Sequence, residues 1–155
     1  IIPNKKIDPN NYIEPDELVN LIEVFWKAKD RFIDGYVQKN PLNLTYRNLN
    51  IIKDFKYGMR KNFLLAVYEK NYTVLNDEGI NYMVKGLNEN LDKFIPAEKT
   101  PMLIQTAIMP FNGMIIYDGF ISTADMQLSQ ELVSKAFEDY SYGQKIYSLL
   151  PKNMN

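Results

Sequence analysis

The dipeptide Asn112-Gly113 stands between two apolar segments and constrains the fold of this chain more than any other feature. Asn and Gly readily adopt the positive φ angles of a two-residue type I′ turn, so residues 100–122 predict a β-hairpin. Side chains alternate between the two faces of a strand, yet both faces of this hairpin are mainly apolar. We therefore expect the hairpin to be covered on both sides and to lie at the centre of a sheet.

The turn also predicts which residues of the two arms face each other. A two-residue loop places Pro110 opposite Ile115 and, farther from the turn, Gln105 opposite Phe120. Pro110 has no backbone N–H to donate, and in this register its backbone nitrogen points away from the partner arm. We expect the outer edge of the first arm to be unpaired near the turn.

The rest of the chain predicts helices on either side of an antiparallel sheet, and hence an α+β fold. Apolar residues recur at spacings of three and four before and after the sheet region, whereas β-branched and aromatic residues dominate within it. An extended arm is predicted over 1–14, followed by two helices over 15–58, the second capped by Thr45. A five-stranded antiparallel meander follows over 62–122; it can curl into a small open barrel and includes a short helix over 88–95. The last predicted element is a C-terminal helix over 124–143, capped by Thr123 or Asp125.

Length and composition predict a single domain. The chain has 155 residues, of which 46% are hydrophobic and 24% charged, which is typical of one folded domain and short for two. It starts at Ile1 rather than Met, so it can be a processed chain or a domain of a longer protein. The formal net charge of −1 gives no overall field that would attract nucleic acid or an anionic membrane.

The absence of Cys and His narrows the possible chemistry. It excludes disulfides, thiolate metal sites and cysteine nucleophiles, and it removes the commonest general base and zinc ligand. The glycines are isolated, so there is no phosphate-binding loop and no dinucleotide-binding motif. An enzyme would have to rely on carboxylates, Lys, Tyr or bound Mg²⁺. We predict no cofactor and no metal site, and we favour a non-catalytic protein.

The sequence also predicts where the protein is found. No apolar run approaches the ~18 residues of a membrane span, and the first residues lack the order of a secretory signal. We expect a soluble cytoplasmic protein. The chain is rich in Asn, Lys, Ile and Tyr, which A/T-rich codons encode, and this favours a bacterial source.

One small basic cluster lies near the end of the predicted second helix. It consists of Arg47, Lys53, Lys56, Arg60 and Lys61, with Tyr57 among them. A solvated helix end, whose cations complement the negative end of the helix dipole, explains such a cluster. The alternative is a contact for phosphate or for an acidic partner.

Asp118 is the most suggestive polar residue, because the hairpin register places its carboxylate among apolar side chains. Burial would raise its pKa, and carboxylates with shifted pKa values occur frequently at functional sites. A strand end is the other interpretation of Tyr117-Asp118-Gly119, in which the Asp side chain bonds the backbone and Gly forms a bulge. The sequence places no second carboxylate beside Asp118.

Part of the hairpin, MPFNGMIIYDGF, resembles a segment that reads roughly LPFKGKIIYDG in a bacterial protein family found mainly in Firmicutes. The resemblance extends weakly upstream, to a strand pair like that predicted over 63–75. The family usually has basic residues where this chain has Asn112 and Met114. The function of that family is unknown, so the resemblance bears on fold and origin only.

These observations favour a non-catalytic module that binds a protein partner. The candidate binding residues are Tyr57, Arg60, Lys61, Tyr117 and Asp118. The first alternative is a nucleic-acid-binding module that uses the basic cluster. The second is a hydrolase that depends on the carboxylate of Asp118. The oligomeric state is left open.

Overall fold

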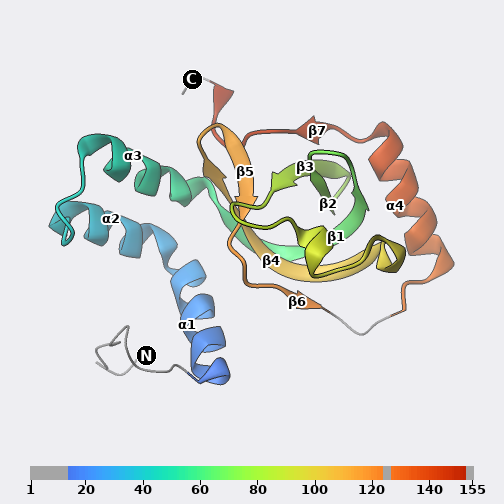
Figure 1. Ribbon diagram of the computed structural model, residues 1–155, viewed down its shortest axis with the longest axis horizontal. Coiled ribbons are helices and arrows are strands. Elements are labelled where there is room, and N and C mark those ends of the chain that lie inside the picture. Colours follow the sequence, from blue (N-terminus) through green and yellow to red (C-terminus); the bar gives the residue numbers. More distant parts are fainter. Residues whose placement is uncertain (1–13, 124–126, 153–155) are drawn as a thin grey trace. The chain divides into compact units, whose positions relative to one another are not determined.

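The computed structural model describes residues 14–123 and 127–152, and it confirms the α+β class. The described residues form four α-helices and a seven-stranded mixed sheet (Figure 1). The chain divides into two compact units, Ile1–Lys56 and Tyr57–Asn155. We call them the helical unit and the sheet unit. The extended arm predicted over 1–14 lies outside the described residues, apart from Glu14.

The helical unit contains three helices where two were predicted. They are α1 (Pro15–Lys27), α2 (Lys29–Lys39) and α3 (Tyr46–Asp54). The first predicted helix is broken at Ala28, whose φ of −126° and ψ of 29° are not helical. The cap of α3 is confirmed, because the Thr45 hydroxyl accepts a hydrogen bond from the Asn48 N–H at 3.3 Å.

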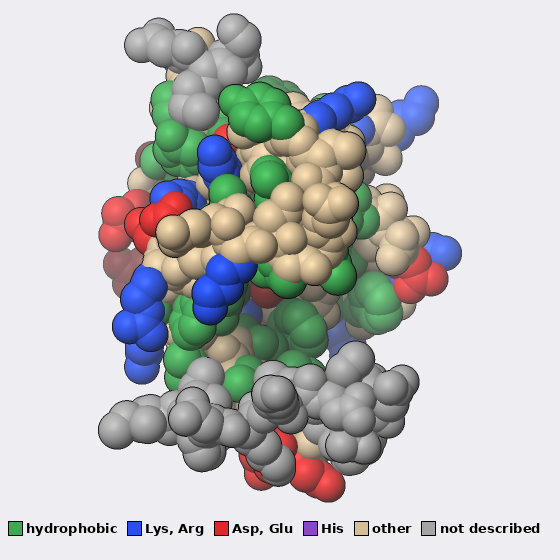
Figure 2. All heavy atoms as spheres, turned by 90° about the vertical axis from the view of Figure 1, so that its left-hand side faces the viewer, with side chains coloured by type: hydrophobic (Ala, Val, Ile, Leu, Met, Phe, Trp, Pro, Cys, Tyr) green, Lys and Arg blue, Asp and Glu red, His purple; other side chains and the backbone are tan. Residues whose placement is uncertain are grey.

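The described helices of this unit bury little. Ile33 on α2 is its one fully buried side chain, and α1 and α3 bury none. Several large apolar side chains are mostly exposed, including Leu42 (72%) and Tyr46 (77%). Figure 2 shows hydrophobic side chains reaching the surface between charged ones. Among residues 14–56, the described helices therefore bury only one side chain fully, that of Ile33.

The sheet unit is not the five-stranded antiparallel meander that was predicted. Its strands are β1 (Met59–Tyr68), β2 (Thr73–Asp77), β3 (Ile80–Lys85), β4 (Met102–Phe111), β5 (Met114–Tyr117), β6 (Ser122–Thr123) and β7 (Lys145–Ile146). Their order is β1-β2-β3-β5-β4-β6, and β3 runs parallel to both β5 and β7. β1 also pairs with β4 (Figure 1). The sheet does not form the small open barrel that was predicted.

The predicted hairpin register is confirmed near the turn and is wrong farther away. Asn112 and Gly113 both have positive φ, and Pro110 pairs with Ile115. The pairing of β1 with β4 extends to Ile108 but not to Pro110, so β1 leaves the edge near the turn unpaired as expected. Beyond β5 the register shifts by two residues, and Gln105 pairs with Ser122 rather than with Phe120.

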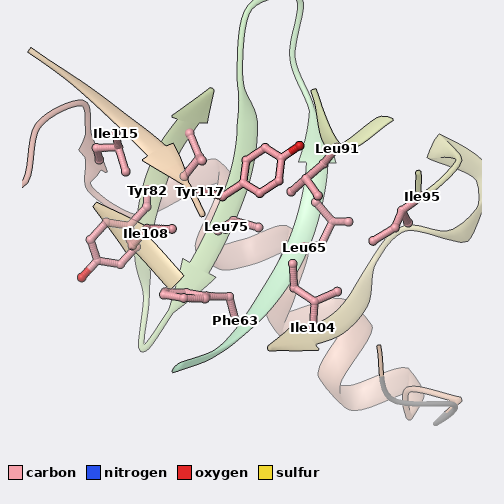
Figure 3. Close-up of a cluster of buried hydrophobic side chains, with 11 residues drawn as sticks. Phe63, Leu65, Leu75, Tyr82, Leu91, Ile95, Ile104, Ile108, Ile115 and Tyr117 are labelled. Atoms are coloured by element: carbon pink, nitrogen blue, oxygen red, sulfur yellow. The ribbon is translucent and has the colours of Figure 1, made fainter. Parts of the chain in front are cut away.

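The hairpin is covered on both faces, as its composition predicted. Neighbouring residues on β4, Ala107 and Ile108, are both fully buried, and so are Ile115 and Ile116 on β5. One face belongs to the main core, where side chains from the strands meet those of Leu91 and Ile95 (Figure 3). The core residues labelled there are Phe63, Leu65, Leu75, Tyr82, Leu91, Ile95, Ile104, Ile108, Ile115 and Tyr117.

Two tyrosines anchor the connection between β3 and β4 to the sheet. The predicted helix over 88–95 is a single 3₁₀ turn at Leu91–Lys93. The Tyr68 hydroxyl donates to the carbonyl of Ile95 at 2.7 Å, and the Tyr117 hydroxyl donates to that of Glu89 at 2.6 Å. These bonds hold the connection over the core, which explains how Leu91 becomes fully buried.

The C-terminal helix is shorter than predicted. α4 spans Gln130–Tyr142, and its N-cap is Ser129, whose hydroxyl accepts a hydrogen bond from the Leu132 N–H at 3.2 Å. Thr123, one of the two predicted caps, pairs in β6 instead. The other, Asp125, lies outside the described residues.

A fully buried asparagine joins the end of α4 to the β2–β3 hairpin. The Asn81 side chain donates to the carbonyl of Asp139 at 2.9 Å and accepts from the Asn76 amide at 3.0 Å. Its backbone N–H donates to the carbonyl of Gln144 at 2.8 Å. Asn81 therefore satisfies polar groups from three segments inside the protein.

Replacing Asn81 tests this junction. Asn81→Ala leaves the buried Asn76 amide without its acceptor and removes one of the two donors to the Asp139 carbonyl, which should lower the free energy of unfolding by about 1–3 kcal/mol. Urea denaturation measures the change. Asn62→Ala, at an exposed position of β1, is the matched control and should change stability by less than about 0.5 kcal/mol. Equal effects of the two variants would contradict the structural role of Asn81.

Burial raises the pKa of Tyr68 to about 12, with a smaller contribution from the charge of Asp92. The folded state therefore keeps the Tyr68 proton at a pH where the unfolded state loses it. This contribution to stability is full below about pH 10 and is lost as the pH rises toward about 12. Urea midpoints between about pH 9 and about pH 12 should fall less steeply for Tyr68→Phe than for the parent. Tyr142→Phe, at an exposed position, should retain the steepness of the parent.

Candidate functional site

An apolar hollow lies between α4 and the sheet. Its volume is about 210 Å³, and we call it the α4 groove. Strand β1, the start of β4 and the C-terminal half of α4 form its walls. The lining residues are Ala66, Val67, Pro101, Ala136, Phe137, Tyr140 and Ser141.

Apolar side chains of α4 are exposed next to this groove. The sequence predicts an apolar stripe that includes Leu132, Ala136 and Phe137. Of the described residues of α4, the structure buries only Ala136, while Leu132 is 49% exposed and Phe137 is 56% exposed. Two residues of the predicted stripe are therefore about half exposed, and one of them, Phe137, lines the groove.

The charge of α4 is predominantly negative. Glu131, Glu138 and Asp139 outnumber Lys135, and the last turn contains no basic residue that would offset the negative end of the helix dipole. Glu131 and Glu138 are exposed. The surroundings of the groove thus favour a positively charged partner over a negatively charged one.

A hydrogen-bonded triad fixes the C-terminal end of the groove. One carboxylate oxygen of Glu69 accepts from the Tyr140 hydroxyl at 2.6 Å and from the Lys145 ammonium at 3.0 Å. These two bonds lower the pKa of Glu69. The triad holds the Tyr140 ring, which lines the groove, in one position.

Asp118 forms a local turn with Gly119 and Phe120. Its carboxylate accepts a hydrogen bond from the Phe120 N–H at 3.0 Å, and Gly119 between them has a φ of 88°. The backbone N–H of Asp118 donates to the carbonyl of Ala107 at 3.1 Å. Burial raises the pKa of Asp118, while the Phe120 N–H and the charge of Arg60 act in the opposite direction. The geometry therefore supports the bulged strand end.

The same turn borders a second hollow of about 270 Å³. Gly119 lines this hollow together with Phe94, Ile95, Ile121 and Thr123. Phe94 is 60% exposed at its rim. The Asp118 carboxylate is not among the lining groups, so the hollow does not make it a binding or catalytic group.

The structure brings Arg60 close to Asp118 but sets Lys61 apart from them. The Arg60 guanidinium lies 3.5 Å from the carbonyl oxygen of Phe120, at the turn that Asp118 forms. Lys61 forms an ion pair of 2.8 Å with Asp77.

The predicted basic cluster does not belong to a single compact unit. Arg47, Lys53 and Lys56 belong to the helical unit, whereas Arg60 and Lys61 belong to the sheet unit. Lys56 forms an ion pair with Asp34. Within the sheet unit, Lys61 is also engaged with a carboxylate. These pairings reduce the cationic character that a phosphate contact requires.

The two candidate tyrosines differ in exposure. Tyr57 lies in the 3₁₀ turn Phe55–Tyr57 and is 39% exposed. Tyr117 is 9% exposed, and its ring packs in the main core. Burial also raises the pKa of Tyr117. Tyr117 therefore stabilises the fold, whereas Tyr57 is accessible to a partner.

The described residues contain neither a cluster of potential metal ligands nor a membrane-spanning helix. Over 14–123 and 127–152, no three acidic side chains cluster in a way that could hold a metal ion. In the same part of the chain, no helix has the length and apolar character needed to cross a membrane.

Comparison with known proteins adds no assignment. No protein-family model, no curated protein and no solved structure matches this chain. The resemblance of the hairpin to a bacterial family therefore stays a prediction from the sequence. The sequence did not predict the α4 groove, because helical spacing indicates an apolar stripe but not what covers it.

Two substitutions separate the structural role of Asp118 from a chemical one. Asp118→Ala removes the acceptor for the Phe120 N–H and should lower the free energy of unfolding by about 1 kcal/mol. Asp118→Asn keeps an oxygen acceptor and removes a partly buried charge, so its stability at neutral pH should equal or exceed that of the parent. Urea denaturation distinguishes the two. A loss of stability in Asp118→Asn as large as in Asp118→Ala would show that the charge itself is needed.

Proposed function

We propose that this protein is a non-catalytic protein-interaction module, and that its α4 groove receives an apolar side chain from a partner with basic flanking residues. One observation carries the proposal: Phe137, which lines the apolar hollow, is 56% exposed, and Leu132 on the same helix is 49% exposed. Exposed apolar side chains beside a concave surface are typical of protein contacts.

The size of the groove favours a side chain over a free small molecule. Pockets for drug-sized ligands usually have volumes of about 300–1,000 Å³, whereas the α4 groove has about 210 Å³. A Leu, Met or Phe side chain anchored by a peptide backbone suits such a hollow. Recognition of this kind is used where an amphipathic helix lies along a hydrophobic groove.

The charge of α4 supports basic residues on the partner. Glu131 and Glu138 are exposed and lie one or two turns from the groove residues. Lys or Arg side chains on the partner can reach them while the apolar anchor occupies the hollow. A partner with acidic flanks would meet like charges and the negative end of the helix.

The two other functions predicted from sequence receive less support. A hydrolase centred on Asp118 would need that carboxylate to be available, but it caps its own turn. A nucleic-acid contact through the basic cluster would compete with the ion pairs of Lys56 and Lys61. A bacterial source and a cytoplasmic location remain predictions from the sequence.

Synthetic peptides test the proposal directly. Three amphipathic helical peptides would be titrated into isotope-labelled protein: one with a Leu/Phe face and Lys flanks, one with the same face and Glu flanks, and one with the face changed to Ser. We expect chemical-shift changes at Ala66, Val67 and Ala136 with the first peptide. Its affinity should exceed that of the Glu peptide at least about tenfold, because two charge contacts of ~0.7 kcal/mol each suffice for that ratio.

A pair of matched variants locates the binding. Ser141→Phe places a ring in the groove and should abolish the shift changes, whereas Ser122→Phe makes the same change at an exposed position of β6 and should leave them intact. The spectra also report whether each variant is folded. Equal binding by the Lys and Glu peptides, or unchanged binding to Ser141→Phe, would reject the proposal.

A further inference from the structure

The tip of the β4–β5 hairpin carries the one Asn-Gly pair of the sequence. Asn112 and Gly113 are both exposed, and their φ angles are 48° and 74°. A Cβ atom added to Gly113 would have no heavy atom within 4 Å apart from its chain neighbours, so the space around the tip is open. The fold therefore uses this pair as a turn and leaves both residues accessible to solvent.

The side-chain amide of Asn112 is free to rotate. Among the described residues, none forms a hydrogen bond with it. By contrast, the side-chain amides of Asn40 and Asn81 each donate to a backbone carbonyl. The residue that follows Asn112 has no side chain, so nothing shields its backbone nitrogen from the Asn112 amide carbon. An amide carbon and an unshielded backbone nitrogen in this order are the reactants of an intramolecular ring closure.

We propose that Asn112 is a site of spontaneous deamidation through a cyclic succinimide, and that local opening of the hairpin tip controls its rate. The backbone nitrogen of Gly113 loses its proton to hydroxide and attacks Cγ of Asn112. The new N–Cγ bond replaces the Cγ–Nδ2 bond, and Nδ2 takes up a proton and leaves as ammonia. Water then opens the ring. Addition of water at Cγ yields aspartate, whereas addition at the backbone carbonyl yields isoaspartate, in which the main chain runs through the side-chain methylene.

The turn conformation opposes ring closure, which is why opening controls the rate. To bring the Gly113 nitrogen onto Cγ, the Cα–C bond of Asn112 must rotate out of the left-handed conformation, and this disturbs the adjoining pair Phe111–Met114. The tip is held lightly. β1 pairs with β4 only as far as Ile108, so the last residues of β4 pair with β5 alone. A segment held on one side opens at a lower free energy than the core of the sheet.

The two products affect the sheet differently. Aspartate keeps the length of the loop and adds one charge at an exposed position. Isoaspartate lengthens the backbone of a two-residue loop, and loop length fixes the register of a hairpin. Ile115 pairs with Pro110 on one side and with Val84 on the other, so a change of register at the tip reaches both neighbouring strands. The tip is not part of the α4 groove, so this modification is independent of the proposed function.

Mass spectrometry of digested protein tests the site, with synthetic peptides as standards for aspartate and isoaspartate. After weeks at neutral pH, conversion at Asn112 should be at least about tenfold faster than at Asn71 and Asn88, a ratio that corresponds to ~1.4 kcal/mol of activation free energy. These two asparagines are exposed outside the strands and precede Tyr and Glu, so they are internal controls. Unfolding in urea should speed conversion of Asn112 at least about fivefold, because the tip is then open in every molecule.

Two variants separate the chemistry from the opening. Gly113→Ala strains the turn, which loosens the tip, but its methyl group shields the nitrogen, so conversion should become at least about fivefold slower. Phe111→Gly removes a cross-strand pair at the tip and should make conversion about twofold faster. Phe94→Gly makes the same change at an exposed position outside the hairpin and should leave the rate unchanged. Circular dichroism reports whether each variant is folded.

The stability of the products tests the effect on the sheet. The isoaspartate form, separated by ion exchange, should show an unfolding equilibrium constant at least about fivefold above that of the parent in urea titrations, whereas Asn112→Asp should match the parent. Conversion at Asn112 no faster than at Asn88, equal rates in folded and unfolded protein, or an isoaspartate form as stable as Asn112→Asp would overturn the proposal.

Discussion

Burial of both faces of the β4–β5 hairpin is the constraint on which the sheet unit depends. Adjacent residues on one strand, Ala107 and Ile108, are both removed from water, and the same holds for Ile115 and Ile116. The free energy gained is roughly proportional to the apolar area buried. An arrangement that left either face of this hairpin in water would forfeit about half of that gain. The other strands, the β3–β4 connection and α4 are arranged around this requirement.

Features encoded by neighbouring residues could be predicted from the sequence. The turn at Asn112-Gly113 and the cap at Thr45 depend on a few adjacent residues, and both are confirmed. The hairpin register follows from the turn and holds as far as Tyr117. It then fails because the Asp118 side chain takes a backbone N–H as its partner and Gly119 adopts a positive φ.

Features that depend on distant segments could not be predicted in the same way. The parallel pairing of β3 with β5 joins strands separated by β4 in sequence, and nothing in either strand alone indicates it. The break at Ala28 falls on a residue type with the highest helix propensity, so the local pattern gave no sign of it. Thr123, a predicted cap, pairs with β4 in β6, and the N-cap of α4 is Ser129.

The candidate site shows the same division. Asp118 and Tyr117 stand out in the sequence for their place in an apolar hairpin, and both are explained by the fold. The α4 groove escaped prediction because helical spacing is identical for a buried and an exposed stripe. Phe137 and Ala136 are both apolar, and the packing of α4 buries Ala136 while leaving Phe137 56% exposed. Composition indicates that an apolar face exists, and tertiary structure decides what covers it.

The pairing of β1 with β4 has a consequence for how the chain folds. Residues 59–65 find their partners in residues 102–108, so this ladder cannot form until the whole intervening segment has emerged and been brought round. Contacts between such distant residues slow folding, since the loop must be closed before any pairing energy is gained. During synthesis the apolar strand β1 therefore stays without its β4 partner for longer than the hairpins do. An apolar strand that waits for its partner exposes unpaired backbone groups and apolar surface, which favours aggregation during this interval.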